Sequence, residues 1–151
     1  MTDDESYFET ATVGETTVTE NRTITEADVV NFAGVSGDFN HLHMDKERME
    51  ESGFGERIAH GMLVFSTATG LLWQARSQEE REAVVAFYGI NDLRFRQPAF
   101  IGDTIHVETE VTETREKPDH PVASGVVHLD AEIKNQHDEV VISCEFLSLM
   151  K

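Results

Sequence analysis

The sequence predicts an α+β fold in which an antiparallel sheet wraps around one long buried helix. The first observation is a run without charge at residues 60–75, because a helix that is apolar on every face is a buried helix. The second is the alternation of apolar and polar residues at 105–112 and 127–134, which is typical of strands with one buried and one wet face. A sheet that covers a single apolar helix satisfies both patterns.

The remaining elements follow from local signals. A β-branched run at 15–24 predicts a first strand. Thr25-Glu-Ala-Asp28 is a variant of the capping box and predicts a helix that runs to Ser36. The other expected elements are a loop at 36–40, a short helix at 45–51, the long helix at 60–76, strands at 83–90 and 92–97, and a last strand through 142–146. The strands after the long helix are expected to form an antiparallel meander.

Length and charge limit the function classes. With 151 residues the chain is expected to form a single domain, residues 1–151. The 29 Asp and Glu exceed the 12 Lys and Arg, so the net charge is −17. Nucleic acids and anionic membrane surfaces attract basic faces, so neither is expected as a partner. Self-repulsion is screened in concentrated salt, where the screening length is about 3 Å near 1 M. We therefore expect a halophilic source, with an ordinary acidic protein as the alternative.

Other features indicate a cytoplasmic protein. Cys144 is the single cysteine, so no intrachain disulfide can form. No run of 18 uncharged apolar residues predicts a transmembrane helix. The N-terminus, residues 1–5, is acidic and does not resemble a signal peptide.

Two segments concentrate groups that could perform chemistry. In the loop 34–45, Asp38 and His43 are five residues apart, so a carboxylate and an imidazole can share one water as an acid–base pair. Asn40 could hold that water or orient Asp38. Gly61 begins the long helix, where free N–H groups and the positive end of the helix dipole can polarise a carbonyl oxygen.

These segments resemble a known family. Phe32-Ala-Gly-Val-Ser-Gly-Asp-Phe-Asn-His-Leu-His-Met-Asp45 resembles the signature of the MaoC-like dehydratases, which include the (R)-specific enoyl-CoA hydratases. Arg57-Ile-Ala-His-Gly-Met62, Leu93-Arg-Phe-Arg-Gln-Pro98 and Gly102-Asp103 match the next blocks in order and spacing. The resemblance covers about residues 8–150. It implies the hot-dog fold, a thioester substrate on coenzyme A, and a homodimer.

The resemblance also implies roles for single residues. Asp38 and His43 fall on the catalytic pair of the family, Asn40 on its supporting Asn, and the Gly61 amide on its oxyanion donor. Ser66 and Thr69 fall where the family places a small hydroxyl residue near the site. His41 departs from the pattern, because the family usually has Pro there, and without Pro the loop loses a fixed φ.

Each assignment has a structural alternative. Asp38 could cap a turn, and His43 could be a structural histidine. His60 is expected to contact the substrate, and the alternative is that it only anchors the start of the helix. Arg94 and Arg96 could bind the phosphates of coenzyme A or lie on a solvated face. The pair Gly102-Asp103 reads as a turn, Cys144 as core, and His106 and His128 as solvent-facing residues.

Zinc binding is the alternative chemistry. The candidate ligands are Asp38, His41, His43, Asp45 and His60. They match no familiar zinc spacing, and acid–base work accounts for the same residues, so we expect no metal.

The sequence therefore predicts reversible hydration of a trans-2-enoyl-CoA to an (R)-3-hydroxyacyl-CoA, the stereochemistry being implied by the resemblance. Coenzyme A is part of the substrate, and no redox or metal cofactor is expected. Asp38 would take a proton from water and His43 would supply one to C2, or the two roles could be exchanged. A thioesterase on the same fold and a non-catalytic acyl-thioester-binding module are the alternatives. Acyl length, and the choice between coenzyme A and acyl carrier protein, stay open.

Overall fold

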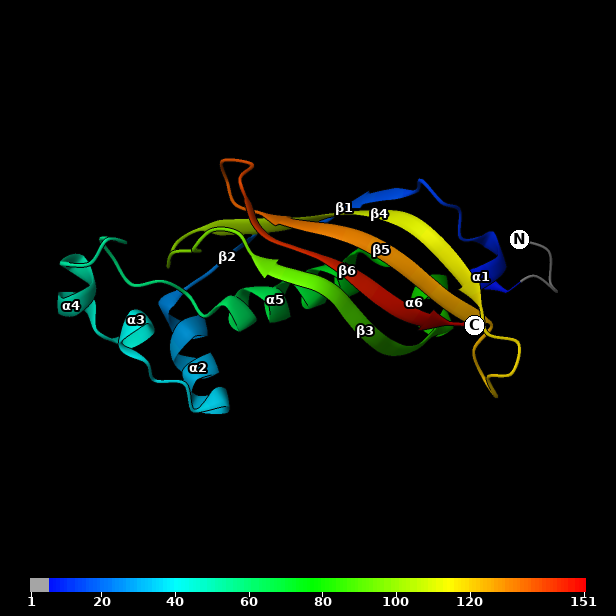
Figure 1. Ribbon diagram of the computed structural model, residues 1–151, viewed down its shortest axis with the longest axis horizontal. Coiled ribbons are helices and arrows are strands. Elements are labelled where there is room, and N and C mark those ends of the chain that lie inside the picture. The colour runs from blue at the N-terminus through cyan, green and yellow to red at the C-terminus, as the bar shows by residue number, and fades with distance from the viewer. Residues whose placement is uncertain (1–5) are drawn as a thin grey trace.

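An antiparallel sheet curves over helix α5 in the computed structural model, which describes residues 6–151 (Figure 1). Residues 1–5, on which the prediction about a signal peptide rests, lie outside the described residues. The elements in chain order are α1 (Tyr7–Thr10), β1 (Thr16–Val18), β2 (Arg22–Thr23), α2 (Glu26–Ser36), α3 (His41–Met44), α4 (Lys46–Glu50), α5 (Gly61–Ala75), α6 (Gln78–Ala83), β3 (Val84–Phe95), β4 (Thr104–Glu116), β5 (Gly125–Lys134) and β6 (Val140–Met150).

The strand order is β1-β4-β5-β6-β3, with β2 also paired to β4. Strands β4, β5 and β6 are successive antiparallel neighbours, so this part is the predicted meander. Strand β3 does not belong to it, because β3 pairs with β6 and the connection from β3 to β4 crosses the sheet. Alternation in a sequence identifies the buried face of a strand but not its neighbour, which explains this difference.

Helix α5 buries one face against the sheet. Its buried side chains and those of the strands form one hydrophobic core that includes Leu63, Val64, Phe65, Ala68, Leu71, Ile105, Val107, Ile133, Val141, Ile142 and Phe146. The prediction that α5 is buried all round is wrong within one chain, because Met62 and Trp73 are each 47% exposed. Helix α5 therefore carries more apolar surface than the sheet of the same chain covers.

Three other predictions need correction. The strand expected at 15–24 is two short exposed strands, β1 and β2. The strands expected at 83–90 and 92–97 are one strand, β3, whose register with β6 shifts between Asn91 and Arg94, where Asp92 has a φ of 53°. His128 is buried rather than solvent-facing, and its Nδ1 lies 3.3 Å from the Glu145 carboxylate. His106 is half-buried beside Glu108.

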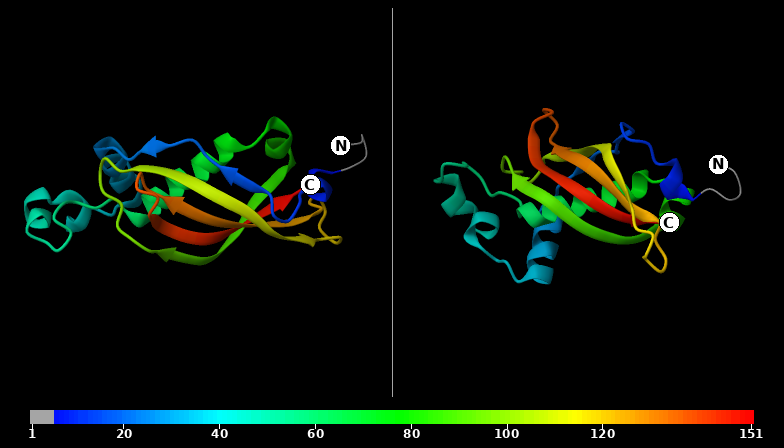
Figure 2. Two further views of the ribbon diagram at one scale, coloured as in Figure 1. Left: turned by 90° about the horizontal axis from the view of Figure 1, so that it is seen from above. Right: turned by 45° about the vertical axis from the view of Figure 1, so that its right-hand side comes forward.

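Capping boxes mark where helices α1, α2 and α6 begin. Thr25 and Asp28 form the predicted capping box of α2. Helices α1 and α6 were not predicted, although Ser6 with Glu9 and Ser77 with Glu80 are capping boxes that the sequence displays. Two further views show α1 and α6 at one end of α5 and α2, α3 and α4 at the other (Figure 2). Within residues 6–151, no helix has the length and apolarity needed to cross a bilayer.

Candidate active site

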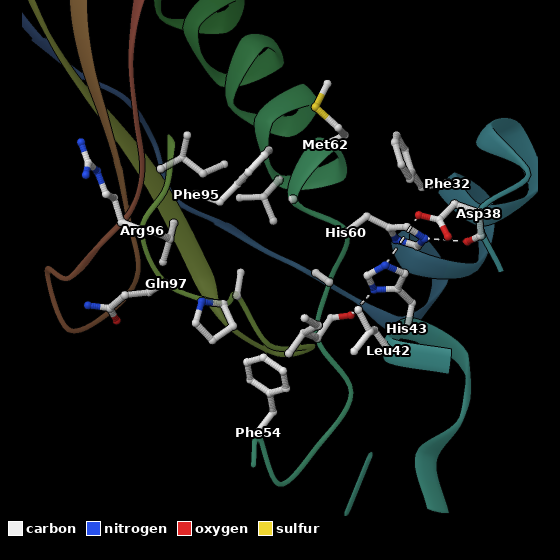
Figure 3. A pocket seen from close by; sticks show the side chains of 18 of the residues that line it. Phe32, Asp38, Leu42, His43, Phe54, His60, Met62, Phe95, Arg96 and Gln97 are labelled. Carbon is white, nitrogen blue, oxygen red and sulfur yellow. Dashed lines mark hydrogen bonds and ion pairs between the residues drawn. The ribbon is translucent and has the colours of Figure 1, made fainter. Parts of the chain in front are cut away.

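A cavity of about 700 Å³ lies at the N-terminal end of α5 (Figure 3). Its volume is within the range of small-molecule sites, and most of its wall is apolar. The apolar wall includes Phe32, Leu42, Phe54, Met62, Phe95 and Pro98, and the polar groups are Ser36, Asp38, His43, His60, Arg96 and Gln97. The α2–α3 loop, the segment 57–61 and the end of β3 thus meet at one concave surface.

His43 lies in the wall of this cavity, and its ring is held by the main chain of Ile58. The two groups are 2.7 Å apart, and since a carbonyl only accepts, the ring donates from Nδ1 and its Nε2 carries the free lone pair when neutral. The side chain is buried, and burial lowers the pKa of His43, although the Ile58 carbonyl and the Asp38 carboxylate act in the opposite direction. At neutral pH, His43 therefore presents an unprotonated Nε2.

Asp38 faces that nitrogen from the loop after α2. Its Oδ2 is 3.8 Å from His43 Nε2, which is too long for a direct hydrogen bond. Its Oδ1 accepts the main-chain N–H of Asn40 at 3.2 Å. The turn role that was the alternative for Asp38 therefore uses one carboxylate oxygen and leaves the other for His43. Two acceptors at this separation suit a water that donates a hydrogen bond to each.

Asn40 contributes differently from the prediction. Its side-chain Oδ1 accepts the N–H of Leu42 at 2.9 Å and caps α3. The side-chain oxygen is thus used by the helix, in the usual role of an N-cap residue, and the side chain makes no hydrogen bond to Asp38. The main-chain N–H of Asn40 is the group that contacts the Asp38 carboxylate.

His60 and Gly61 form the start of α5. His60 is 3% exposed, and its Nε2 donates to the main-chain oxygen of Asp38 at 2.9 Å. Gly61 is the first helical residue and lines the cavity. A Cβ on Gly61 would lie 2.5 Å from Cε1 of Phe95, so the missing side chain lets that ring approach the helix end. N–H groups of a first helical turn have no intrahelical partner, so the Gly61 amide can bind an oxygen of a ligand.

Four predicted residues, Asn40 among them, do not line this cavity. Ser66 and Thr69 lie farther along α5, and the Thr69 hydroxyl donates to the Ser66 main-chain oxygen at 2.6 Å. Thr69 instead lines a second cavity of about 360 Å³, beside Trp73 and Phe87. Of the two arginines, Arg96 lines the first cavity and bonds the Ser143 hydroxyl.

Arg94 is the fourth predicted residue that does not line the cavity. Its guanidinium donates to the main-chain oxygen of Leu93. Arg94 and Arg96 lie two residues apart at the end of β3, but only Arg96 lines the cavity.

Three side chains at this cavity carry possible metal-ligand atoms. One ligand atom from each of Asp38, His43 and His60 lies within 4.8 Å of the others, whereas His41 and Asp45 do not join this cluster. The rings of His43 and His60 are stacked at 3.7 Å with 27° between their planes. A histidine lone pair lies in its ring plane, so two stacked rings do not converge on an ion at bond lengths of about 2.0–2.1 Å. One ring would have to turn before a metal could bind.

Some residues of the site were missed in the sequence. The Ile58 carbonyl holds His43, and Arg57 ties this segment to α2 through Glu26 at 2.9 Å. The sequence block 57–62 contains both residues, but its local pattern points only to His60 and Gly61. Phe54 and Phe95 line the cavity from a loop and from the end of β3, and no local pattern marks such residues.

Comparison with known proteins places the chain in a family. The family model described as "MaoC like domain" matches residues 8–132. Protein MaoC of Klebsiella aerogenes is 48% identical over 101 residues, which are 67% of this chain and 29% of that protein. The chain therefore spans under a third of that relative. An (R)-specific enoyl-CoA hydratase of Aeromonas caviae is 39% identical over 98 residues, 65% of this chain and 68% of that protein.

Solved structures agree on the fold. A protein of Archaeoglobus fulgidus, described as a monoamine oxidase regulatory protein, has a TM-score of 0.86 and 40% identity, and the match covers 95% of this chain and 93% of that one. A Mycobacterium tuberculosis protein described as a double hot-dog fold has a TM-score of 0.80 and 21% identity, covering 95% of this chain and 43% of that one. The hot-dog fold implied by the sequence motifs is confirmed.

Proposed function

The chain belongs to the MaoC-like dehydratase family, and on that premise we propose that it catalyses the reversible hydration of a trans-2-enoyl-CoA to an (R)-3-hydroxyacyl-CoA. The observation that carries the proposal is the free Oδ2 of Asp38 facing Nε2 of His43 at 3.8 Å, inside the cavity that Gly61 also lines. An Aeromonas caviae relative named as an (R)-specific enoyl-CoA hydratase supports the same reaction.

The Gly61 amide would bind the thioester oxygen. This hydrogen bond draws electron density from the conjugated double bond, makes C3 electrophilic and stabilises the negative charge that develops on the oxygen. Helix α5 has 15 residues, so its dipole adds to the effect of the amide. The apolar wall of the cavity would exclude bulk water from the double bond.

The water that attacks C3 would lie between Asp38 and His43. In the resting enzyme both groups are acceptors, since the Asp38 carboxylate is exposed and Nε2 of His43 is unprotonated. Neither holds a proton to give, so both the hydroxyl and the proton that reach the substrate would come from this water. As the water oxygen bonds to C3, one O–H bond breaks and its proton passes to one of the two groups. That group then protonates C2, the thioester carbonyl re-forms, and delivery from one side gives syn addition.

An assay with a series of enoyl-CoA substrates of increasing chain length tests the proposal. We expect loss of the enoyl absorbance without release of free thiol. Thiol release with the double bond intact would identify a thioesterase instead. The Archaeoglobus fulgidus protein described as regulatory keeps the binding module as the second candidate. Ligand binding without turnover, and equal affinity in the Asp38→Asn variant, would identify that function.

We propose that no metal or redox cofactor takes part, because acid–base groups and an oxyanion donor supply the whole reaction. Dialysis against a chelator is expected to leave turnover unchanged. Loss of activity that stoichiometric zinc restores would contradict this.

A second copy of this chain is the proposed partner. Strand β3 ends the sheet order, and Phe87 and Tyr88 on it are 53% and 51% exposed. Met62 and Trp73 extend the exposed apolar surface onto α5. Open strand edges invite pairing, and a two-fold partner would cover the edge of β3 and the exposed face of α5 together. We therefore propose a homodimer.

Salt dependence is proposed for the dimer and its activity. Glu110, Asp130 and Glu145 occupy directly opposite positions on β4, β5 and β6. Like charges in register destabilise a sheet, and two chains would carry twice the −17 of one. Near 1 M salt the screening length of about 3 Å leaves only close contacts, so Arg96 could then hold a phosphate of coenzyme A despite the overall charge.

Sedimentation and activity measured together from low salt to molar KCl test both ideas. We expect association and turnover to rise together. Phe87→Asp should weaken the dimer, whereas Val122→Asp is the matched control, because Val122 is 56% exposed and lies in the β4–β5 connection. A fully active monomer at low salt would contradict both proposals, and a dimer whose activity falls with salt would contradict the second.

A further inference from the structure

We infer that His60 is a positioning residue that holds Asp38 and His43 in register with each other, an inference that rests on the proposed function. One contact is the hydrogen bond from its Nε2 to the main-chain oxygen of Asp38. The other hydrogen bonds of Asp38 join it to Ser36 and Asn40, two residues away on either side. Among the described residues, His60 is therefore the group that ties the Asp38 main chain to a distant part of the chain.

The second contact is with the other member of the pair. The His60 ring stacks on the His43 ring with 3.7 Å between centroids, and Phe32 meets His60 edge to face at 5.0 Å. His43 is thus fixed on one side by the Ile58 carbonyl and against a flat ring on the other. A single side chain therefore touches both halves of the pair, as Figure 3 shows.

The surroundings of His60 distinguish this positioning role from two simpler ones, that of a helix cap and that of a substrate ligand. Within residues 6–151, Nδ1 is buried and has no hydrogen-bond partner. His60 occupies the N-cap of α5 without a side-chain capping bond, so it does not serve as the cap that a Ser or Asp would provide. Nδ1 is also shielded from the cavity, which argues against the substrate-binding role expected from the sequence. An unpaired buried acceptor is costly, so the hydrogen bond to Asp38 and the stack on His43 must offset that cost.

Two variants separate the two contacts. His60→Phe keeps a ring on His43 but removes the donor to Asp38, and His60→Gln keeps a donor of similar reach but removes the ring. For His60→Phe we expect kcat to fall about 10-fold with KM nearly unchanged, since misplacing a catalytic group lowers turnover rather than binding. For His60→Gln we expect kcat within about threefold of the unsubstituted protein.

The pH titration of His43, followed by NMR of labelled histidine, is a readout that needs no substrate. In His60→Gln we expect the pKa of His43 to rise, because water replaces the ring that shields it. In His60→Phe the pKa should stay low, while amide exchange of residues 37–39 quickens because the tether is lost. His137→Gln, on the exposed turn between β5 and β6, is the matched control and should change neither measurement.

The outcomes are distinct. An increase in KM with kcat unchanged would make His60 a substrate ligand and overturn the inference. Unchanged kcat in both variants, together with an unchanged His43 titration and loop exchange, would overturn it as well. If the unsubstituted protein does not hydrate enoyl thioesters, the proposed function fails, and the titration and exchange data still decide the positioning role.

Discussion

The two ends of helix α5 contrast in how their polar groups are paired. At the C-terminal end, the Tyr7 hydroxyl donates to Glu80 at 3.0 Å, and Arg76 donates to the Ser148 hydroxyl at 3.1 Å. The N–H of Phe8 donates to the main-chain oxygen of Lys151 at 2.8 Å, which fastens α1 to the end of the chain. Helices α1 and α6 cover this end, and the spaces left between side chains there are small or apolar.

At the N-terminal end, the polar groups are only partly paired. Nδ1 of His60 has no partner within residues 6–151, and Asp38 keeps one oxygen free. Asp38 and Gly61 line the cavity, so a ligand can reach the free carboxylate oxygen and the first-turn amide, whereas His60 Nδ1 is shielded. The same helix therefore has a structural end and an end that forms part of the proposed active site, called here the functional end.

The largest expected effect is at the functional end. Asp38→Asn and His43→Gln should each lower turnover by at least about 100-fold, the usual scale for a lost acid or base. The double variant should be little slower than either single one, because groups that act on one water are not additive. Thermal unfolding should show a folded protein in each case. Near-normal turnover in either single variant would contradict the assignment, and would remove the functional half of the contrast.

The pH dependence of turnover sharpens the same point. Burial places the pKa of His43 below its ordinary value of 6.5, and the proposed reaction uses the unprotonated ring. Activity should therefore persist below pH 6.5 and fall about tenfold per pH unit once the pH drops below the folded pKa. Rate–pH profiles measure this, and an acidic limb centred above 6.5 would contradict it.

The lowered pKa of His43 should also make the unfolding free energy fall as the pH falls, in the same direction as turnover. The unfolded chain takes up a proton near pH 6.5, where folded His43 does not, so the unfolded state binds more protons in that window. The contribution of His43 to stability is thus complete above pH 6.5 and is lost as the pH falls through the folded pKa. Denaturant unfolding across this range, compared with His43→Gln, measures the contribution.

The contrast also explains how much the sequence could predict. Periodicity and caps are local, and they identified α2, α5 and the alternating strands. The family motif identified Asp38, His43 and Gly61, which the fold brings to one cavity. The place of β3 beside β6 was beyond local patterns, because strand order depends on contacts between distant segments.

Side-chain roles inside the site were harder to predict than its location. Asn40 was expected to hold the water or to orient Asp38, and the sequence did not show that its side-chain oxygen caps α3. Ile58 could not be identified from its side chain, because its contribution is a main-chain carbonyl. Thr69 was expected at the site, but Val64 is the last residue of α5 that lines the cavity.

Two glycines offer a matched comparison of the two ends. At Gly125, a Cβ would meet the buried Phe8 ring and lie 2.5 Å from the Arg115 main-chain oxygen, neither of which can move easily. Gly125→Ala should therefore cost about 1–3 kcal/mol of unfolding free energy and leave kcat unchanged. At Gly61, a Cβ would meet the exposed Phe95 ring, which can move into the cavity.

Gly61→Ala should consequently have the opposite profile. The displaced Phe95 ring narrows the cavity, so kcat/KM should fall about tenfold while the unfolding free energy changes little. Urea unfolding and steady-state kinetics on both variants measure the pair. Equal losses of stability in the two variants would show that the ends of α5 do not differ in this way.

The smallest expected effect is at the structural end, in Tyr7→Phe. The variant keeps the ring but removes the hydroxyl that donates to Glu80 across the gap between α1 and α6. The unfolding free energy should fall by about 1 kcal/mol, the net value of one hydrogen bond, with no change in kcat.

Burial first, and then the Glu80 carboxylate, raise the pKa of Tyr7 in the folded protein, so its hydroxyl stays protonated where an unfolded tyrosine would ionise. A group with a raised pKa stabilises fully below the unfolded value of 10.0 and loses that contribution only as the pH rises through the folded value. The difference between Tyr7→Phe and the unsubstituted protein in urea should thus be constant from pH 7 to pH 9. A difference that vanishes at pH 9, or a lowered kcat, would mean that the structural end is not independent of the site.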